Sequence, residues 1–181
     1  MFTRGNILSL NPTGCRTSAY GAPAGVAASR AAVDHHMGRL NQYKSVFYQV
    51  GQRQNVSPAL LGGIASRESG VGEYIEGTGG YGDHGNAYGL MQIDLRYSGL
   101  NRADILSHRW DSSGHVSMAV GILLSKARSV GQGRLQAAVA AYNCGEGAVG
   151  GHNVDANTTG GDYSNDVLAR AQYLIQNQGW Q

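Results

Sequence analysis

Apolar residues recur at helical spacing over most of the chain. Between residues 26 and 55, an Ala-rich stretch precedes four apolar residues that share one helical face, namely Leu40, Tyr43, Phe47 and Val50. Gly38 and Gly51 interrupt this segment and are expected to divide it into two helices. Residues 1–24 show little periodicity and are expected to form an irregular N-terminal lead-in, followed by a single domain over residues 25–181.

A shorter helix is predicted between Ser57 and Gly70. Ser57 is a good N-cap, Pro58 suits the first helical position, and Gly70 suits the end. The inward face of this helix carries apolar residues at i, i+3 and i+4, namely Leu61, Ile64 and Ala65, and Glu68 at i+7.

Three further helices are predicted in the second half of the chain. They cover residues 111–130, residues 133–143, and a final amphipathic segment that Ser164 is expected to cap. Residues 71–100 are rich in Gly and contain spaced tyrosines, so a small β-hairpin is expected there. The pattern predicts a mainly α fold, with one helical domain and a small hairpin region in its Gly-rich middle.

Glu68 is the first candidate for chemistry. A carboxylate on an apolar face is costly unless it is paired, or unless its pKa rises and it keeps a proton near neutral pH. A protonated acid in a partly apolar cleft is what general-acid catalysis needs. The alternative is a Glu68 that reaches the surface from the helix end or pairs with a buried arginine.

Asp83 and Asp94 lie in the Gly-rich segment that follows. Together with Glu68 they form a set of three carboxylates between positions 68 and 94. Hydrolysis of a glycosidic bond needs one acid to protonate the leaving oxygen and one carboxylate to activate water or to attack directly. The alternative is structural: Asp83 would cap a turn, and Asp94 would cap a helix that begins near Leu95.

Composition excludes several other classes. The chain is 41% apolar and 14% charged, with a net charge of +2, which is ordinary for a globular protein and too weak to indicate a nucleic-acid partner. No stretch approaches the roughly 18–20 apolar residues of a membrane span, and the N-terminus lacks the apolar run of a signal peptide. The six histidines lack a metal-ligand spacing, so no metal or cofactor is expected, and Cys15 and Cys144 are expected to be free thiols.

Four blocks in the same order resemble goose-type lysozyme. They are Ser66–Ser69 (SRES), Gly82–Asp94 (GDHGNAYGLMQID), Ala141–Gly147 (AYNCGEG) and Asp162–Gln172 (DYSNDVLARAQ). The resemblance extends from about Gly14 to the C-terminus, and within the family the chain is similar to fish members that lack a signal peptide. It implies an α+β, lysozyme-like fold. In contrast to the four cysteines of secreted bird members, only Cys15 has a counterpart here.

The resemblance also implies an activity and a set of residues. The activity is hydrolysis of the β-1,4 bond between N-acetylmuramic acid and N-acetylglucosamine in bacterial peptidoglycan, with inversion, by a monomer that needs no cofactor and also binds N-acetylglucosamine oligomers. The implied residues are the acid Glu68, the water-holding Asp83 and Asp94, and the sugar-cleft residues Gln92, Tyr142, Asn143 and Tyr163. Two alternatives remain open: a lytic transglycosylase, and a non-catalytic peptidoglycan- or chitin-binding module.

Overall fold

The computed structural model describes residues 2–131 and 133–181. Its helices are α1 (Arg4–Leu8), α2 (Val26–Gln54), α3 (Pro58–Ser69), α4 (Arg102–Leu106), α5 (Ser113–Val130), α6 (Leu135–Cys144) and α7 (Tyr163–Asn177). Three short strands, β1 (Tyr81–Gly82), β2 (Ala87–Tyr88) and β3 (Ile93–Asp94), form a small antiparallel sheet in the order β1-β2-β3. The predicted mainly α fold with a small hairpin region is therefore confirmed.

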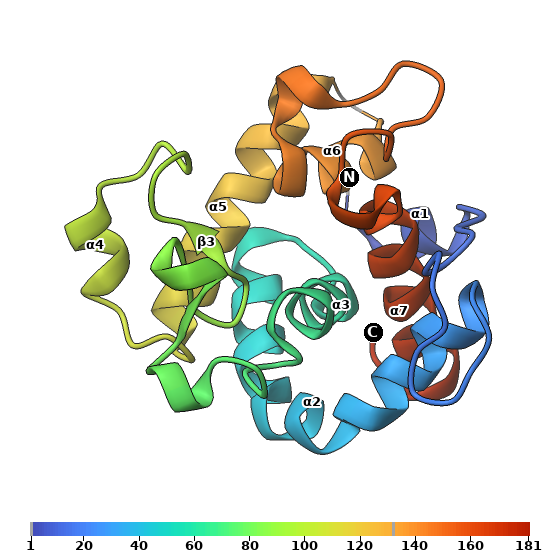
Figure 1. Ribbon diagram of the computed structural model, residues 1–181, viewed down its shortest axis with the longest axis horizontal. Coiled ribbons are helices and arrows are strands. Elements are labelled where there is room, and N and C mark those ends of the chain that lie inside the picture. The colour runs from blue at the N-terminus through green and yellow to red at the C-terminus, as the bar shows by residue number, and fades with distance from the viewer. Residues whose placement is uncertain (1, 132) are drawn as a thin grey trace.

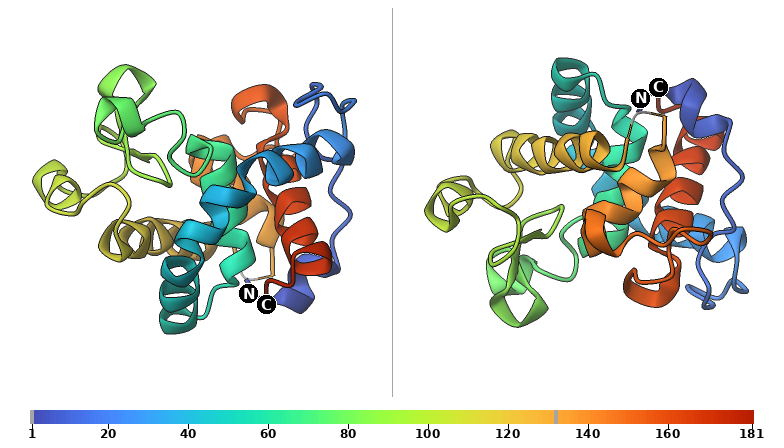
Figure 2. Two further views of the ribbon diagram at one scale, coloured as in Figure 1. Left: turned by 90° about the horizontal axis from the view of Figure 1, so that it is seen from below. Right: turned by 90° about the horizontal axis from the view of Figure 1, so that it is seen from above.

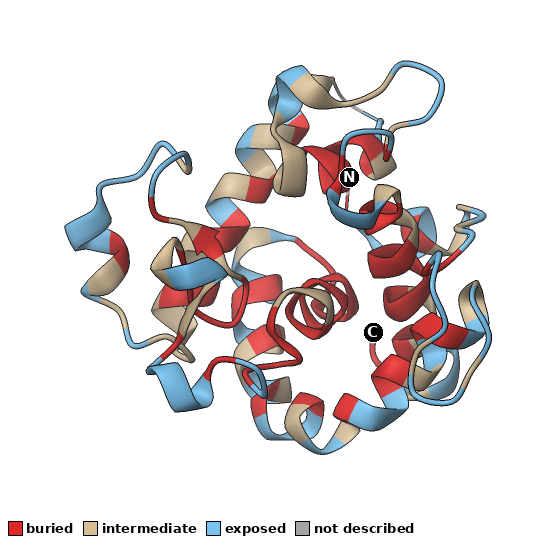
Figure 3. Cartoon of the chain, in the orientation of Figure 1, coloured by how far each residue is buried: buried red, intermediate tan, exposed pale blue. Residues whose placement is uncertain are grey.

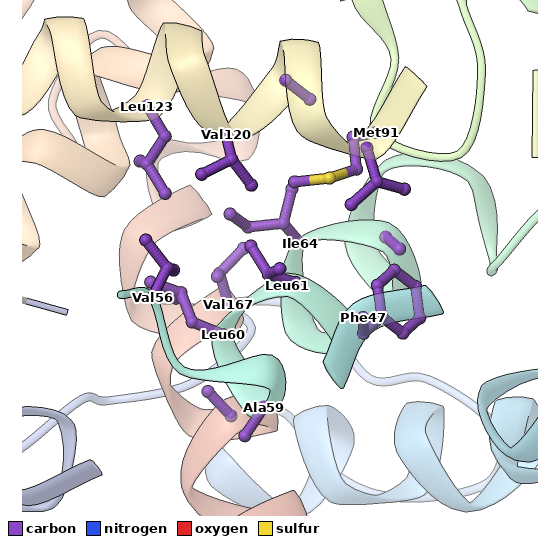
Figure 4. Close-up of a cluster of buried hydrophobic side chains, with 14 of the residues drawn as sticks. Phe47, Val56, Ala59, Leu60, Leu61, Ile64, Met91, Val120, Leu123 and Val167 are labelled. Carbon is purple, nitrogen blue, oxygen red and sulfur yellow. The ribbon is translucent and has the colours of Figure 1, made fainter. Parts of the chain in front are cut away.

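Helix α3 lies at the centre of the molecule. Figure 1 shows it almost end-on, with α2, α5, α6 and α7 around it, and the views in Figure 2 agree with this arrangement. Nearly every residue of α3 is buried, whereas α4 and the outer loops are largely exposed (Figure 3). Leu61 and Ile64 of α3 pack in one cluster with residues from three other helices, namely Phe47, Val120 and Val167 (Figure 4). Burial of this apolar surface fixes the position of α3.

The predicted bounds of α3 are confirmed, and Ser57 occupies the N-cap position, but its side chain makes no capping hydrogen bond. Pro58 occupies the first turn, and Gly70 ends the helix in the left-handed conformation at φ 59°. The Ser57 side chain caps nothing: its Oγ is buried and makes no hydrogen bond with any described residue. The backbone carbonyl of Ser57 accepts from Leu60 N at 3.0 Å instead.

Helix α2 is one continuous helix, so the predicted division at Gly38 and Gly51 is wrong. Glycine inside a helix costs about 1 kcal/mol relative to alanine, which burial of a large apolar face outweighs. That face includes Leu40 and Phe47, both 0% exposed. The helix ends beyond Gly51 at Asn55, which adopts the left-handed conformation at φ 55°.

The N-terminal lead-in is more ordered than its sequence indicates. It contains α1, and the side chains of Phe2 and Ile7 are buried in the main core. Gln172 of α7 holds the segment by donating two hydrogen bonds, to the carbonyls of Ile7 and Leu10, both at 2.9 Å. Both cysteines are free thiols, as expected.

Helix α7 begins one residue before its predicted cap. Ser164 lies in the first turn and donates its hydroxyl to Asp155 Oδ2 at 2.8 Å. Asp155, from the preceding loop, also accepts from the backbone N–H groups of Ser164 and Asn165 at 2.9 and 3.0 Å. A carboxylate eight residues before the helix therefore satisfies two N–H groups of the first turn of α7, and the Ser164 side chain does not act as the cap.

The sheet positions the two aspartates that the sequence singles out. Ala87 of β2 pairs with Gly82 on one side and with Asp94 on the other, so Asp94 and the residue before Asp83 flank the same strand. The Gly-rich segment thus brings the two carboxylates to one end of the sheet. No helix in residues 2–131 and 133–181 combines the length and apolar character that a membrane crossing requires.

Candidate active site

A cleft of about 650 Å³ opens between α3, the sheet, α5 and α6. Six of the seven candidate residues line it, namely Glu68, Asp83, Gln92, Asp94, Tyr142 and Asn143. Segments far apart in the sequence thus converge on one concave surface, and the structure brings together most of the predicted site.

Glu68 sits at the last turn of α3, partly buried at the cleft wall. Burial raises the pKa of Glu68 to about 7, although the hydrogen bond from Tyr163 and the charge of Arg67 both lower it. The Tyr163 hydroxyl donates to Glu68 Oε1 at 2.5 Å. Because Oε1 is occupied by this bond, the proton of the neutral acid is placed on Oε2.

The structure places Tyr163 behind Glu68 and not on the cleft surface. Tyr163 is 1% exposed and does not line the cleft. As the first residue of α7, it is packed where α3 and α7 meet, and only its hydroxyl reaches the site, through Glu68. The expected contact of Tyr163 with a sugar ring is therefore corrected to support of the carboxyl group.

Asp83 and Asp94 are joined by Arg96. The Arg96 guanidinium donates to Asp94 Oδ2 at 2.9 Å and to Asp83 Oδ2 at 3.2 Å. Asp94 Oδ1 also accepts from the backbone N–H groups of Arg96 and Tyr97, at 2.7 and 2.9 Å. Partial burial acts to raise the pKa of Asp94, but the hydrogen bonds from Arg96 and Tyr97 hold it below its usual value.

The structural alternatives for the two aspartates apply in part. Asp94 does cap a turn through its Oδ1, but no helix begins near Leu95. Asp83 opens a single 3₁₀ turn, Asp83–Gly85, with a positive φ of 46°. Gln92 has a φ of 47°, so two non-glycine residues of the cleft wall adopt a conformation that side chains rarely tolerate. Such strain is concentrated at functional sites.

Tyr142 and Asn143 come from the end of α6. The Tyr142 hydroxyl donates to the carbonyl of Met91 at 2.8 Å, which links α6 to the loop before β3. The Asn143 side chain accepts from Thr159 N at 2.8 Å and donates to Thr159 Oγ1 at 3.3 Å. These bonds fix the two side chains at the cleft wall.

A buried charge network supports the helix end that carries Glu68. Arg67 donates to Asp166 Oδ2 at 2.6 Å and to Asp162 Oδ1 at 3.0 Å, and Arg170 donates to Asp166 and to Ser66 Oγ. Burial acts to raise the pKa of Asp166, but Arg170 and its hydrogen bonds hold it below the usual range. The Arg67 guanidinium is therefore bound to Asp162 and Asp166 at the start of α7. Among the described residues, Glu68 has no hydrogen-bonded basic partner.

Sequence reasoning missed Arg96, Tyr97 and Lys126. Tyr97 is 79% exposed and lines the cleft, and Lys126 lines it while paired with Glu146. The position of Arg96 two residues after Asp94 was an available signal for an Asp–Arg pair. Lys126 belongs to α5, and only the folded chain brings it to the cleft.

A carboxylic acid with a raised pKa, in an open cleft that two further carboxylates also line, is the arrangement of a glycoside hydrolase. The comparisons with known proteins agree. The lysozyme g family model matches residues 4–179, and the chain belongs to this family. It is therefore a lysozyme, a glycoside hydrolase whose substrate class is bacterial peptidoglycan.

Individual relatives are similar over most of the chain. The chain is 34% identical to lysozyme g of Gallus gallus over 95% of its own length and 84% of the relative's, and 36% identical to lysozyme g of Epinephelus coioides over 97% and 98%. It is 40% identical, over 97% of its length, to a glycine, glutamate and proline-rich protein of Lottia gigantea. The chain spans only 45% of that last protein.

Proposed function

We propose that the cleft hydrolyses the β-1,4 bond between N-acetylmuramic acid and N-acetylglucosamine with inversion, in defence against bacteria. Glu68 protonates the glycosidic oxygen from Oε2. The observation that carries this role is its burial, which raises the pKa of Glu68 to about 7 and keeps a proton available near neutral pH. Tyr163 orients the carboxyl group through Oε1.

The attacking water is held by the two aspartates, with unequal roles. Asp94 accepts four hydrogen bonds, two from the backbone N–H groups of Arg96 and Tyr97 and two from the Arg96 guanidinium. Its lowered pKa makes it a weak base. The side chain of Asp83 contacts Arg96, and both are exposed, so this ion pair is weak and separates readily. Asp83 is therefore the base, and Asp94 positions Arg96 and the water.

An inverting mechanism requires a minimum distance between the two carboxyl groups. A water molecule has to fit between the base and the sugar, so the carboxyl groups of Glu68 and Asp83 are expected to be roughly 6.5–9.5 Å or more apart. A retaining enzyme would need a carboxylate close enough to attack the sugar.

Sugar contacts are assigned to the polar atoms and aromatic rings of the cleft residues that are not used in hydrogen bonds within the protein. Gln92 Nε2 donates to the carbonyl of Gly89 at 2.9 Å, and its amide oxygen, which packs over Gly82, is assigned to a substrate hydroxyl or acetamido N–H. The Tyr142 ring packs on a sugar, while Asn143 uses its second amide hydrogen. Exposed Tyr97 offers a further ring at the cleft edge.

The anomeric configuration of the first product tests this mechanism. NMR of an N-acetylglucosamine oligomer digest, recorded before mutarotation, is expected to show an α-configured new reducing end, and Glu68→Gln is expected to lower the rate by about 10²–10⁴-fold. A β product would overturn inversion. Anhydro-muropeptides from peptidoglycan would instead establish a lytic transglycosylase, and sugar binding without lysis would establish a binding module.

A further inference from the structure

A second group of potential ligands lies outside the cleft. His35 and His36 of α2 and Glu73, in the loop after α3, bring three ligand atoms within 4.8 Å of one another. None of the three lines the cleft. We propose that these residues form a binding site for a divalent transition-metal ion of the zinc class.

The distances suit one ion. Glu73 Oε2 lies 3.2 Å from His35 Nε2 and 3.7 Å from His36 Nε2. Zinc binds nitrogen and oxygen at about 2.0–2.2 Å, so two of its tetrahedral ligands lie about 3.4 Å apart. The two glutamate–histidine distances are close to this value, and all three ligand atoms lie within 4.8 Å of one another, so side-chain movements can bring them onto one ion. Two imidazoles with one carboxylate leave a fourth position for water.

The contact of His36 Nδ1 with Ser66 orients the imidazole ring so that Nε2 can bind a metal ion. Its side chain is 0% exposed, and Nδ1 lies 2.9 Å from Ser66 Oγ. Metal binding at Nε2 requires the tautomer with its proton on Nδ1, and Ser66 Oγ can accept that hydrogen bond while it also accepts from Arg170 at 2.8 Å.

The other two ligands are open to solvent. The side chains of His35 and Glu73 are 42% and 39% exposed, which gives an ion an entry path. Tyr20 stacks on His35 with ring centroids 4.2 Å apart, and the hydroxyls of Tyr20 and Tyr74 lie 3.3 and 3.1 Å from His36 Nε2. The ion would replace these two hydroxyl contacts. Imidazole ligands favour zinc, copper and nickel over magnesium.

Occupancy is expected to stabilise the fold. The site connects α2 to the loop after α3, and an ion that binds only the folded chain raises the midpoint of unfolding. The sequence contained no recognisable ligand spacing because the two histidines are adjacent and the glutamate follows 37 residues after His36.

Calorimetry and thermal unfolding with ZnCl₂ test the site, using the whole chain after removal of metals with EDTA. The folded protein is expected to bind one zinc ion and to melt at a higher temperature, with MgCl₂ as the inactive control. His35→Gln and Glu73→Gln each remove an exposed ligand and are expected to weaken binding by roughly tenfold or more. The matched control His152→Gln changes an exposed histidine elsewhere and is expected to leave binding unchanged.

Two results would overturn the site. One is equal zinc affinity in the wild type, His35→Gln and Glu73→Gln. The other is a loss in His152→Gln as large as in the ligand variants, which would indicate nonspecific binding to surface histidines. Neither result depends on lysozyme activity, so the site is tested independently of the proposed mechanism.

Discussion

Glu68 is subject to opposing influences on its proton affinity. Burial at the end of α3 favours the neutral acid, whereas the Tyr163 hydroxyl and the Arg67 charge favour the carboxylate. Burial is the largest of the three, so the pKa rises to about 7. Arg67 has limited effect because its guanidinium is bound to Asp162 and Asp166 of the α7 region.

The division of roles between the two aspartates gives a prediction at the residue scale. Asp83→Asn removes the proposed base and is expected to lower kcat by about 10²–10⁴-fold with little change in KM. Asp94→Asn keeps an oxygen that can accept from Arg96 N and Tyr97 N, so the turn persists and a smaller loss is expected. Steady-state kinetics on a soluble oligomer check both variants. A larger loss in Asp94→Asn would reverse the assignment.

At the scale of elements, α3 and α7 approach so closely at Gly63 that no side chain fits at this position. A Cβ on Gly63 would lie 2.8 Å from the Val167 carbonyl oxygen and 3.3 Å from Ala171 N. These are backbone atoms of α7, which cannot yield without moving the helix that carries Tyr163. The contact thus connects packing directly to the support of Glu68.

Gly63→Ala is therefore expected to lower the free energy of unfolding by about 1–3 kcal/mol, measured by urea denaturation. Gly38→Ala is the matched control, because a Cβ there meets nothing within 4 Å. In that exposed helical position, alanine is expected to stabilise by about 0.5–1 kcal/mol. A Gly63→Ala protein as stable as the wild type would contradict the close packing.

Sequence patterns predicted elements where the signal was local. Pro58 and Gly70 act within their own helix, so the bounds of α3 could be predicted. The donors at the start of α7 are satisfied by Asp155 across a loop, which no local pattern indicates. The same holds for the cleft. The positions of Glu68, Asp83 and Asp94 in it could be predicted from nearby sequence, whereas the hydrogen bond from Tyr163 to Glu68 and the presence of Lys126 depend on how the helices pack.

At the scale of the whole molecule, the proton on Glu68 makes stability depend on pH. Its pKa is about 7 in the folded protein and 4.5 in the absence of burial. Between these values the folded chain retains a proton that the unfolded chain releases, so stability decreases as pH rises through this window. The expected loss is at most about 3 kcal/mol.

Glu68→Gln is expected to remove this dependence, because its amide does not titrate. Thermal unfolding of both proteins between pH 4.5 and pH 8 checks this prediction. The wild type should lose stability relative to the variant as the pH rises, and above pH 7 the variant should be the more stable protein. Parallel curves for the two proteins would show that Glu68 carries no elevated pKa.

A direct titration of Glu68 is the most decisive test of the central claim. NMR of its carboxyl carbon, assigned by comparison with Glu68→Gln, follows the ionisation of this one group in the folded enzyme. The structure predicts a midpoint near pH 7. A midpoint at or below the ordinary value of 4.5 would mean that the group is ionised at neutral pH, and Glu68 could not then be the acid that cleaves the sugar bond.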